Sequence, residues 1–178
     1  MMHNATRKLQ QGFTLIELLI VIAVLGVLAA GVLVAINPGE QLARARDASR
    51  KTTVGQLSKA AQAYYTSQGG YPTATAGWLT TLVNAGEIKS IPGAISASGY
   101  SSCSTGAQNG FCYNPSGATE AVVYTRLESI SEKTKGGCTS TTAGTEGTYF
   151  VWASDVSKAG LYCGTSEPTV GMAASSIK

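Results

Sequence analysis

The chain has 178 residues, of which 13% are charged, with 13 Lys and Arg against 10 Asp and Glu. This length suits one domain together with an anchor, and the near balance of charge predicts no strong field for nucleic acid or an anionic membrane. The one histidine, His3, lies beside the N-terminus, so the rest of the chain has no imidazole for acid–base catalysis or metal binding.

A short polar segment and a long apolar segment begin the chain. Residues 1–12 contain Arg7 and Lys8 and end in Gly12, and between Phe13 and Ile36 only Thr14 and Glu17 are polar. About 24 residues at roughly 1.5 Å of helical rise span roughly 36 Å, more than the bilayer core of about 30 Å. We therefore expect residues 13–36 to form a membrane-spanning helix.

Glu17 is the unusual residue in this segment. A carboxylate costs on the order of 2.5–3.5 kcal/mol at the bilayer centre and less near an end, so it needs a partner. A cut after Gly12 would expose the α-amino group of Phe13 one helical turn away, and in an assembly each amine could pair with a neighbour's carboxylate. The other interpretation is a Glu17 that reaches the headgroups or is protonated.

These residues together resemble the class III signal of type IV pilins and type II secretion pseudopilins. The resemblance is carried by the basic segment ending in Gly12, by Phe13, by an acid four residues later and by the unbroken apolar run. It implies that a prepilin peptidase cleaves after Gly12 on the cytoplasmic side and N-methylates Phe13. It also implies a role in assembly for Glu17.

A second helical segment is expected over residues 37–68. Asn37 fits an N-cap, Pro38 fits the first helical position and Glu40 completes a capping box, so the helix is expected to break at Asn37 and Pro38. Beyond this point the spacing predicts one dry face and one solvated face. The dry face comprises Leu42, Ala45, Val54, Leu57, Ala61 and Tyr64, and the solvated face comprises Arg46, Arg50, Lys59 and Gln62.

Residues 69–178 are predicted to form one small globular domain. A short helix is expected around Trp78 and Leu82, ending at Gly86, and a glycine-rich loop over residues 93–117. Three strands are predicted, from Ala121 to Leu127, from Thr148 to Ala153 and from Gly160 to Cys163. A long polar excursion over 128–147 and a surface tail over 167–178 complete the domain.

The four cysteines all lie in this domain. None forms a C-x-x-C pair, so Cys103, Cys112, Cys138 and Cys163 suit disulfides in an oxidising compartment better than a zinc site. The pairs Cys103 with Cys112 and Cys138 with Cys163 are favoured among the three possible pairings. Disulfides place the domain outside the cytoplasm, although the basic residues after the span, Arg44, Arg46, Arg50 and Lys51, outnumber those before it and favour the opposite orientation.

The fold class is predicted to be α+β. A long N-terminal helix, membrane-spanning in its first half and amphipathic in its second, packs against a small antiparallel β-sheet, because neither element would be stable alone; the resemblance to pilins implies the same arrangement. No catalytic motif, phosphate-binding loop, cofactor site or metal site is predicted, so the chain is not expected to be an enzyme.

The predicted function is that of a structural subunit of a type IV pilus or pseudopilus, polymerised through residues 13–36. The resemblance implies these partners: copies of the chain or related pilins, prepilin peptidase, an assembly ATPase with its platform protein, and the inner membrane before assembly. The expected location is a single-pass cytoplasmic membrane protein with an extracytoplasmic domain, and a cell-surface filament after assembly. The alternative is a membrane-tethered adhesin or binding module that never polymerises.

Overall fold

The computed structural model describes residues 12–73, 76–95, 103, 106–138 and 147–178. The predicted leader, with Arg7 and Lys8, lies outside the described residues except for Gly12. The chain divides into two compact units, residues 1–41 and residues 42–178, and each is described by itself.

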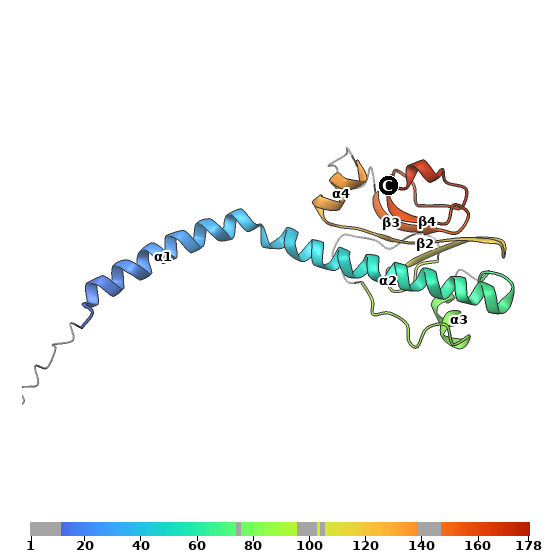
Figure 1. Ribbon diagram of the computed structural model, residues 1–178, viewed down its shortest axis with the longest axis horizontal. Coiled ribbons are helices and arrows are strands. Elements are labelled where there is room, and N and C mark those ends of the chain that lie inside the picture. The colour runs from blue at the N-terminus through green and yellow to red at the C-terminus, as the bar shows by residue number, and fades with distance from the viewer. Residues whose placement is uncertain (1–11, 74–75, 96–102, 104–105, 139–146) are drawn as a thin grey trace, which may run out of the picture. The chain divides into compact units, whose positions relative to one another are not determined.

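The first unit contains helix α1 (Leu15–Ile36), the blue ribbon in Figure 1. Apolar side chains surround the helix on all sides, and none of its 22 residues is buried among the described residues. Within the described part of the chain, α1 is the one helix whose length and composition suit a membrane span. These properties agree with the apolar first half of the predicted long helix.

Helix α2 (Pro38–Gln68) supplies one face to the core of the second unit. Val54, Leu57 and Ala61 are buried, as the helical spacing predicts. The predicted faces are wrong near the start of the helix, where Leu42 is 60% exposed and Arg50 is only 3% exposed. The buried face there is polar, and the ion pairs described below explain why.

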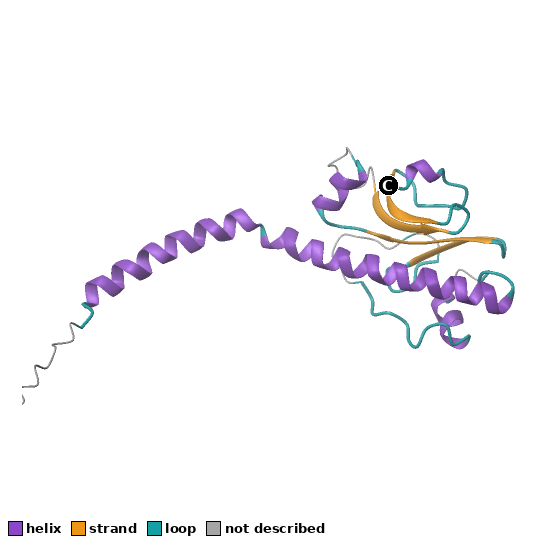
Figure 2. Ribbon diagram, in the orientation of Figure 1, coloured by secondary structure: helices purple, strands orange, loops and turns teal. Residues whose placement is uncertain are grey.

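The second unit contains a four-stranded antiparallel sheet, drawn in orange in Figure 2. Its strands pair in chain order, each with the next along the sheet. The strands are β1 (Cys112–Ser116), β2 (Glu120–Arg126), β3 (Gly147–Ala153) and β4 (Lys158–Gly164). The long helix packed on an antiparallel sheet confirms the predicted α+β, pilin-like fold class.

Both faces of the sheet are covered. On one face Val123, opposite Tyr113 and Trp152 in the register, joins a core with α2 and with α3 (Trp78–Asn84). On the other face Tyr124 and Val151 pack with residues near the C-terminus. The sequence left open which face of β2 points inward, and the answer is that both do.

Two elements lie where no regular structure was expected. β1 occupies the predicted glycine-rich loop, and it follows a tight turn in which Asn109 and Gly110 both have positive φ, the signature of a hairpin connection. α4 (Ile130–Gly136) occupies the predicted polar excursion and is capped by the Ser129 hydroxyl. The short helix α3, by contrast, lies where it was expected.

The chain's last residues seal one edge of the sheet. The Lys178 N–H donates to the Leu161 carbonyl of β4 at 2.8 Å, and the Leu161 N–H donates back to the Lys178 carbonyl at 2.8 Å. Ile177 beside it is 1% exposed. The expectation of a tail lying wholly at the surface is therefore wrong here, and at the opposite edge β1 carries Pro115, which has no N–H to offer.

Candidate functional site

The N-terminal turn of α1 is organised by Thr14 and Glu17. Thr14 is the N-cap, with extended backbone angles, and its hydroxyl oxygen accepts the Glu17 N–H at 3.3 Å. The Glu17 carboxylate reaches back, and its Oε2 accepts the Thr14 N–H at 2.9 Å and the Thr14 hydroxyl at 2.7 Å. This is a capping box, which satisfies donors that a helix start otherwise leaves unpaired.

The capping box holds the Glu17 carboxylate at the very start of the helix. It therefore lies one residue from the peptide bond between Gly12 and Phe13, both of which are exposed. Only Oε2 has a hydrogen-bond partner among the described residues, and a carboxylate has further lone pairs for a cation. The sequence singled out Glu17 but did not anticipate this contact with Thr14, although a threonine followed three residues later by glutamate is its usual signal.

The junction between α1 and α2 is formed by Asn37 and Pro38. Asn37 has left-handed backbone angles, with φ of 47°, and ends α1. Its side-chain oxygen accepts the Glu40 N–H at 3.4 Å, and Pro38 is the first residue of α2, where its missing N–H has no helical partner to lose. One residue therefore terminates the first helix and caps the second.

A buried cluster of charges fastens the start of α2 to the domain. Asp47 is 1% exposed and accepts three kinds of donor: Arg50 Nη1 at 3.0 Å, the Glu128 N–H at 3.1 Å and the Ser129 N–H at 2.8 Å. Because Ser129 caps α4, one carboxylate on α2 fixes the connection between β2 and α4. A buried carboxylate with several donors is satisfied, so Asp47 can be buried without water as a partner.

Glu128 and Glu132 extend the cluster. Glu128 lies between Arg46 and Arg50, with oxygen–nitrogen distances of 2.6 and 3.0 Å, and the Arg46 hydrogen bond lowers the pKa of Glu128 despite its burial. Burial raises the pKa of Glu132, but contacts with Lys51 and Lys135 outweigh it and lower that pKa below its ordinary value. Among these cations, the Arg50 side chain is buried and the Lys51 side chain is partly buried, whereas the side chains of Arg46 and Lys135 are exposed.

This cluster is the feature that the sequence analysis missed. Asp47 and Arg50 continue the helical spacing of the buried Val54, Leu57 and Ala61. That spacing could have indicated that Asp47 and Arg50 are buried, but charged side chains on α2 were assigned to the solvated face because they are charged. Their partners come from about 80 residues later in the chain, and no local pattern identifies such pairs.

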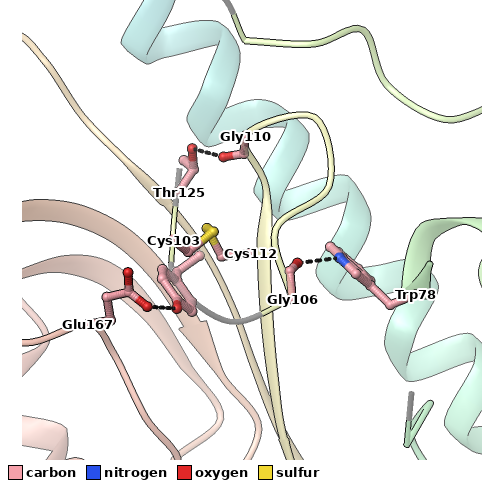
Figure 3. Close-up of a disulfide and its surroundings, with 8 residues drawn as sticks. Trp78, Cys103, Gly106, Gly110, Cys112, Thr125 and Glu167 are labelled. Carbon is pink, nitrogen blue, oxygen red and sulfur yellow. Dashed lines mark hydrogen bonds between the residues drawn. A yellow bond between two sulfur atoms is a disulfide. The ribbon is translucent and has the colours of Figure 1, made fainter. Parts of the chain in front are cut away.

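Two disulfides also hold parts of the domain together. Cys103 is bonded to Cys112 and Cys138 to Cys163, with Cα–Cα distances of 5.9 and 5.6 Å, the same pairs that the sequence favoured. Figure 3 shows the first of them at the beginning of β1, between the Thr125–Gly110 and Trp78–Gly106 hydrogen bonds. It therefore helps to hold the segment before β1 against α3 and β2.

The described residues contain no group of three or more His, Cys, Asp or Glu side chains placed to hold a metal ion. All four cysteines are engaged in disulfides, and the acids of the α2 cluster are occupied by cations and by backbone N–H groups. The geometry of the described residues therefore offers anchoring and packing, and no constellation for acid–base or nucleophilic chemistry.

Comparison with known proteins identifies the N-terminal segment. Residues 7–33 match the family model described as "Prokaryotic N-terminal methylation motif". This match covers Gly12, Phe13, Glu17 and most of α1, the residues that carried the resemblance stated from the sequence. The motif is thus present in this chain.

A longer similarity extends beyond the motif. The chain is 37% identical over 95 residues to "Fimbrial protein EcpC" of Eikenella corrodens, which is 52% of this chain and 59% of that protein. The search of solved structures found no match. Both similarities are with pilin-type structural proteins rather than with enzymes.

The methylation motif, the exposed apolar helix and the sheet packed on α2 agree with one another and with the fimbrial relative. The chain carries the N-terminal methylation motif that is the class III signal of type IV pilins, and it is a distant homologue of a fimbrial protein.

Proposed function

We propose that the chain is a structural subunit of a type IV filament, polymerised through its N-terminal helix. The observation that carries this proposal is α1, whose 22 residues include none that is buried. A helix that is apolar on all sides must be covered by lipid or by other protein. In the proposal, lipid covers it during storage in the membrane, and copies of the same helix cover it in the filament.

Processing precedes assembly in this proposal. Prepilin peptidase cuts between Gly12 and Phe13 and methylates the new Phe13 amine, leaving residues 13–36 as the membrane and filament-core segment. Residues 37–68 continue the helix, and residues 69–178 complete the extracytoplasmic domain. Moving such a helix from lipid into a bundle of equally apolar helices needs no large free energy, because both surroundings are apolar. The resemblance assigns the work of assembly to an ATPase and a platform protein.

Glu17 has a defined task in this scheme. Its Oε2 is occupied by Thr14, while Oε1 has no partner among the described residues. We assign Oε1 to the Phe13 amine of a neighbouring copy. A carboxylate in apolar surroundings is tolerated only where a cation meets it, so this pair would set the axial register of the subunits.

The orientation of the domain follows from its cysteines. Two disulfides are expected outside the cytoplasm rather than within it. The basic residues that favour the opposite orientation have structural partners: Arg46 and Arg50 pair with Glu128, and Lys51 pairs with Glu132. Their presence after the span is thus explained by the fold. The fimbrial relative favours a surface pilus over a secretion pseudopilus.

Mass spectrometry of the N-terminus of the purified mature chain tests the proposal. The expected product begins with N-methylated Phe13. An intact Met1 in the functioning protein, or a cut beyond Ile36, would instead support a tethered adhesin or binding module that never polymerises.

A matched pair of glycine variants controls this measurement. Gly12→Leu should block processing, because it changes the residue at the cleavage site. Gly26→Ala should be processed normally, since a methyl group there meets no atom within 4 Å. Electron microscopy of the same cells then reports whether only the processed variant enters filaments.

A further inference from the structure

The second unit has a shallow hollow beside α2. It has a volume of about 530 Å³ and lies between the helix and the segment that follows α3. Its floor is apolar, with Leu57 and Ala60 from the helix and Ile88 from the segment. A second hollow of about 350 Å³ shares Pro92 with it and extends toward Phe111. Both hollows are lined by α2, and we refer to the two together as the groove.

Two lysines on the wall of the first hollow lack acidic partners. Lys59 of α2 and Lys89 of the segment are exposed, and no ion pair or hydrogen bond engages either ammonium group among the described residues. The wall also carries Glu87, but its carboxylate accepts the Ser67 hydroxyl at 3.0 Å. The hollow therefore has a net positive charge above an apolar floor, in contrast to the neutralised cluster around Asp47.

A feature of opposite charge lies elsewhere on the same unit. The hairpin between β1 and β2 has a tip of small exposed residues, from Ser116 to Thr119, followed by Glu120. Among the described residues no hydrogen bond or ion pair engages the Glu120 carboxylate. The tip is held firmly, because the Tyr71 N–H donates to the Ala118 carbonyl at 2.7 Å just beyond the end of α2.

We propose that the hairpin tip of one copy docks in the groove of the next, with Glu120 between Lys59 and Lys89. The inference deepens the proposed function and rests on it. A filament needs a contact between two different patches of the same chain, since a self-complementary patch produces closed dimers. The groove and the hairpin tip are such a pair: one is hollow and positive, and the other is exposed and carries an acid.

The placement of the two patches along α2 gives the contact a direction. The hairpin tip contacts Gly70, about 11 residues beyond Lys59, which corresponds to roughly 16 Å of helical rise. Two copies with parallel α2 helices would therefore be offset by roughly this distance when they dock. The contact is head-to-tail and repeats without closing, as a filament requires.

Cysteine cross-linking in intact filaments tests the contact directly. All four native cysteines are in disulfides, so a chain carrying Lys89→Cys and Glu120→Cys has only these two free thiols. Oxidation of its filaments should give a ladder of covalent multimers, and oxidation of the detergent-solubilised subunit should not. A control chain with Thr134→Cys, at an exposed site of α4, and Glu120→Cys should give no ladder.

Charge-reversal variants test the same contact through the amount of filament recovered. The Lys59→Glu, Lys89→Glu variant places three acids together and should reduce the filament recovered by about tenfold or more, because like charges across an interface oppose association. Glu120→Lys alone should also reduce it. The variant with all three changes should recover most of the yield, which a merely structural role of these residues would not produce.

The outcomes separate this contact from the proposed function. If the unaltered chain forms no filament, the proposed function fails first. If the unaltered chain forms filaments but the Lys89–Glu120 pair gives no ladder, the contact is wrong and the proposed function stands. Full filament yield after charge reversal would also overturn the proposed contact. So would a cross-link from Lys89→Cys to a different protein. Tryptophan fluorescence during denaturation verifies that each variant is folded.

Discussion

Helices α1 and α2 follow one another in the chain and depend on opposite surroundings. α1 is apolar on every side and buries none of its residues within the chain. α2 is polar over much of its length, yet it buries both the aliphatic Leu57 and the charged Asp47 against its own domain. The boundary between them is the pair Asn37 and Pro38.

The comparison shows that hydrophobicity alone does not indicate which helix the fold stabilises. No residue of the more apolar helix is buried among the described residues, so we expect its stability to come from lipid or from other copies. The more polar helix is held by its own domain, because its buried Arg50 pairs with Glu128 and its buried Asp47 accepts the Ser129 N–H. We therefore expect changes in α1 to affect assembly, and changes in α2 to affect folding.

The largest effect is expected at Glu17, where charge and helix capping can be separated. Glu17→Gln retains an oxygen for Thr14, because glutamine also completes a capping box, but it removes the negative charge. Filament yield, measured by electron microscopy and by the amount of sheared filament, should fall by about tenfold or more, as expected when a buried ion pair loses one partner. Cleavage after Gly12 should continue.

Thr14→Ala is the matched control for Glu17. It removes the cap and keeps the charge, so its effect on filament yield should be smaller. A Glu17→Gln variant that assembles normally would remove the charge from the mechanism and leave only the cap.

The next largest effect is expected on the stability of the domain. Asp47→Ala leaves Arg50 without its close carboxylate and leaves the Glu128 and Ser129 N–H groups unpaired. The free energy of unfolding should fall by about 3–5 kcal/mol. Denaturation of the full chain in detergent, followed through Trp78 and Trp152, measures this fall, and Asp47→Asn should lose less because it keeps one acceptor oxygen.

A pair of equivalent leucine substitutions compares the two helices directly. Leu57 is 1% exposed, so Leu57→Ala should lower the free energy of unfolding of the domain by about 2–5 kcal/mol. Leu25 of α1 is 57% exposed, and Leu25→Ala should leave the same measurement unchanged. Equal losses from both substitutions would contradict the division between the helices.

The smallest effect is expected from acid. The Arg46 hydrogen bond lowers the pKa of Glu128 below its ordinary value of 4.5, so folding favours the ionised form. Its contribution to stability is complete above about pH 4.5 and is lost as the pH falls through the lowered value. The free energy of unfolding of Glu128→Gln should therefore depend less on pH between about 5 and 3, and a slope identical to that of the unaltered chain would show that Glu128 contributes nothing.

Much of the architecture could be predicted because the relevant signals are local. The apolar run predicts α1, the Asn37–Pro38 pair has the residues of a helix boundary, and the β-branched and aromatic run around Val123 predicts β2. β1 was missed because Asn114 and Pro115 are typical of turns, and tertiary pairing with β2 overrode that preference. α4 was missed because seven residues are too few for helical spacing to stand out.

In the candidate site, too, residues with a local signal could be predicted and residues with distant partners could not. Gly12, Phe13 and Glu17 form a contiguous motif, and the sequence alone singles them out. Arg50 was assigned to solvent because its carboxylate partner Glu128 is 78 positions away in the numbering, and the burial of a charge depends on such distant partners. The proposed contact between the groove and the hairpin tip also joins residues far apart in the sequence, so no local pattern predicts it.

The sealed edges of the sheet have a consequence for packing at high density. In a filament, folded domains would be held beside one another at a local concentration far above that of a solution, which normally favours strand addition between open sheet edges. Here the backbone of Lys178 already occupies Leu161 of β4, and the proline in β1 interrupts pairing at the other side. Neighbouring domains in such a filament would therefore offer one another few free backbone groups, which disfavours amyloid-like fusion between them.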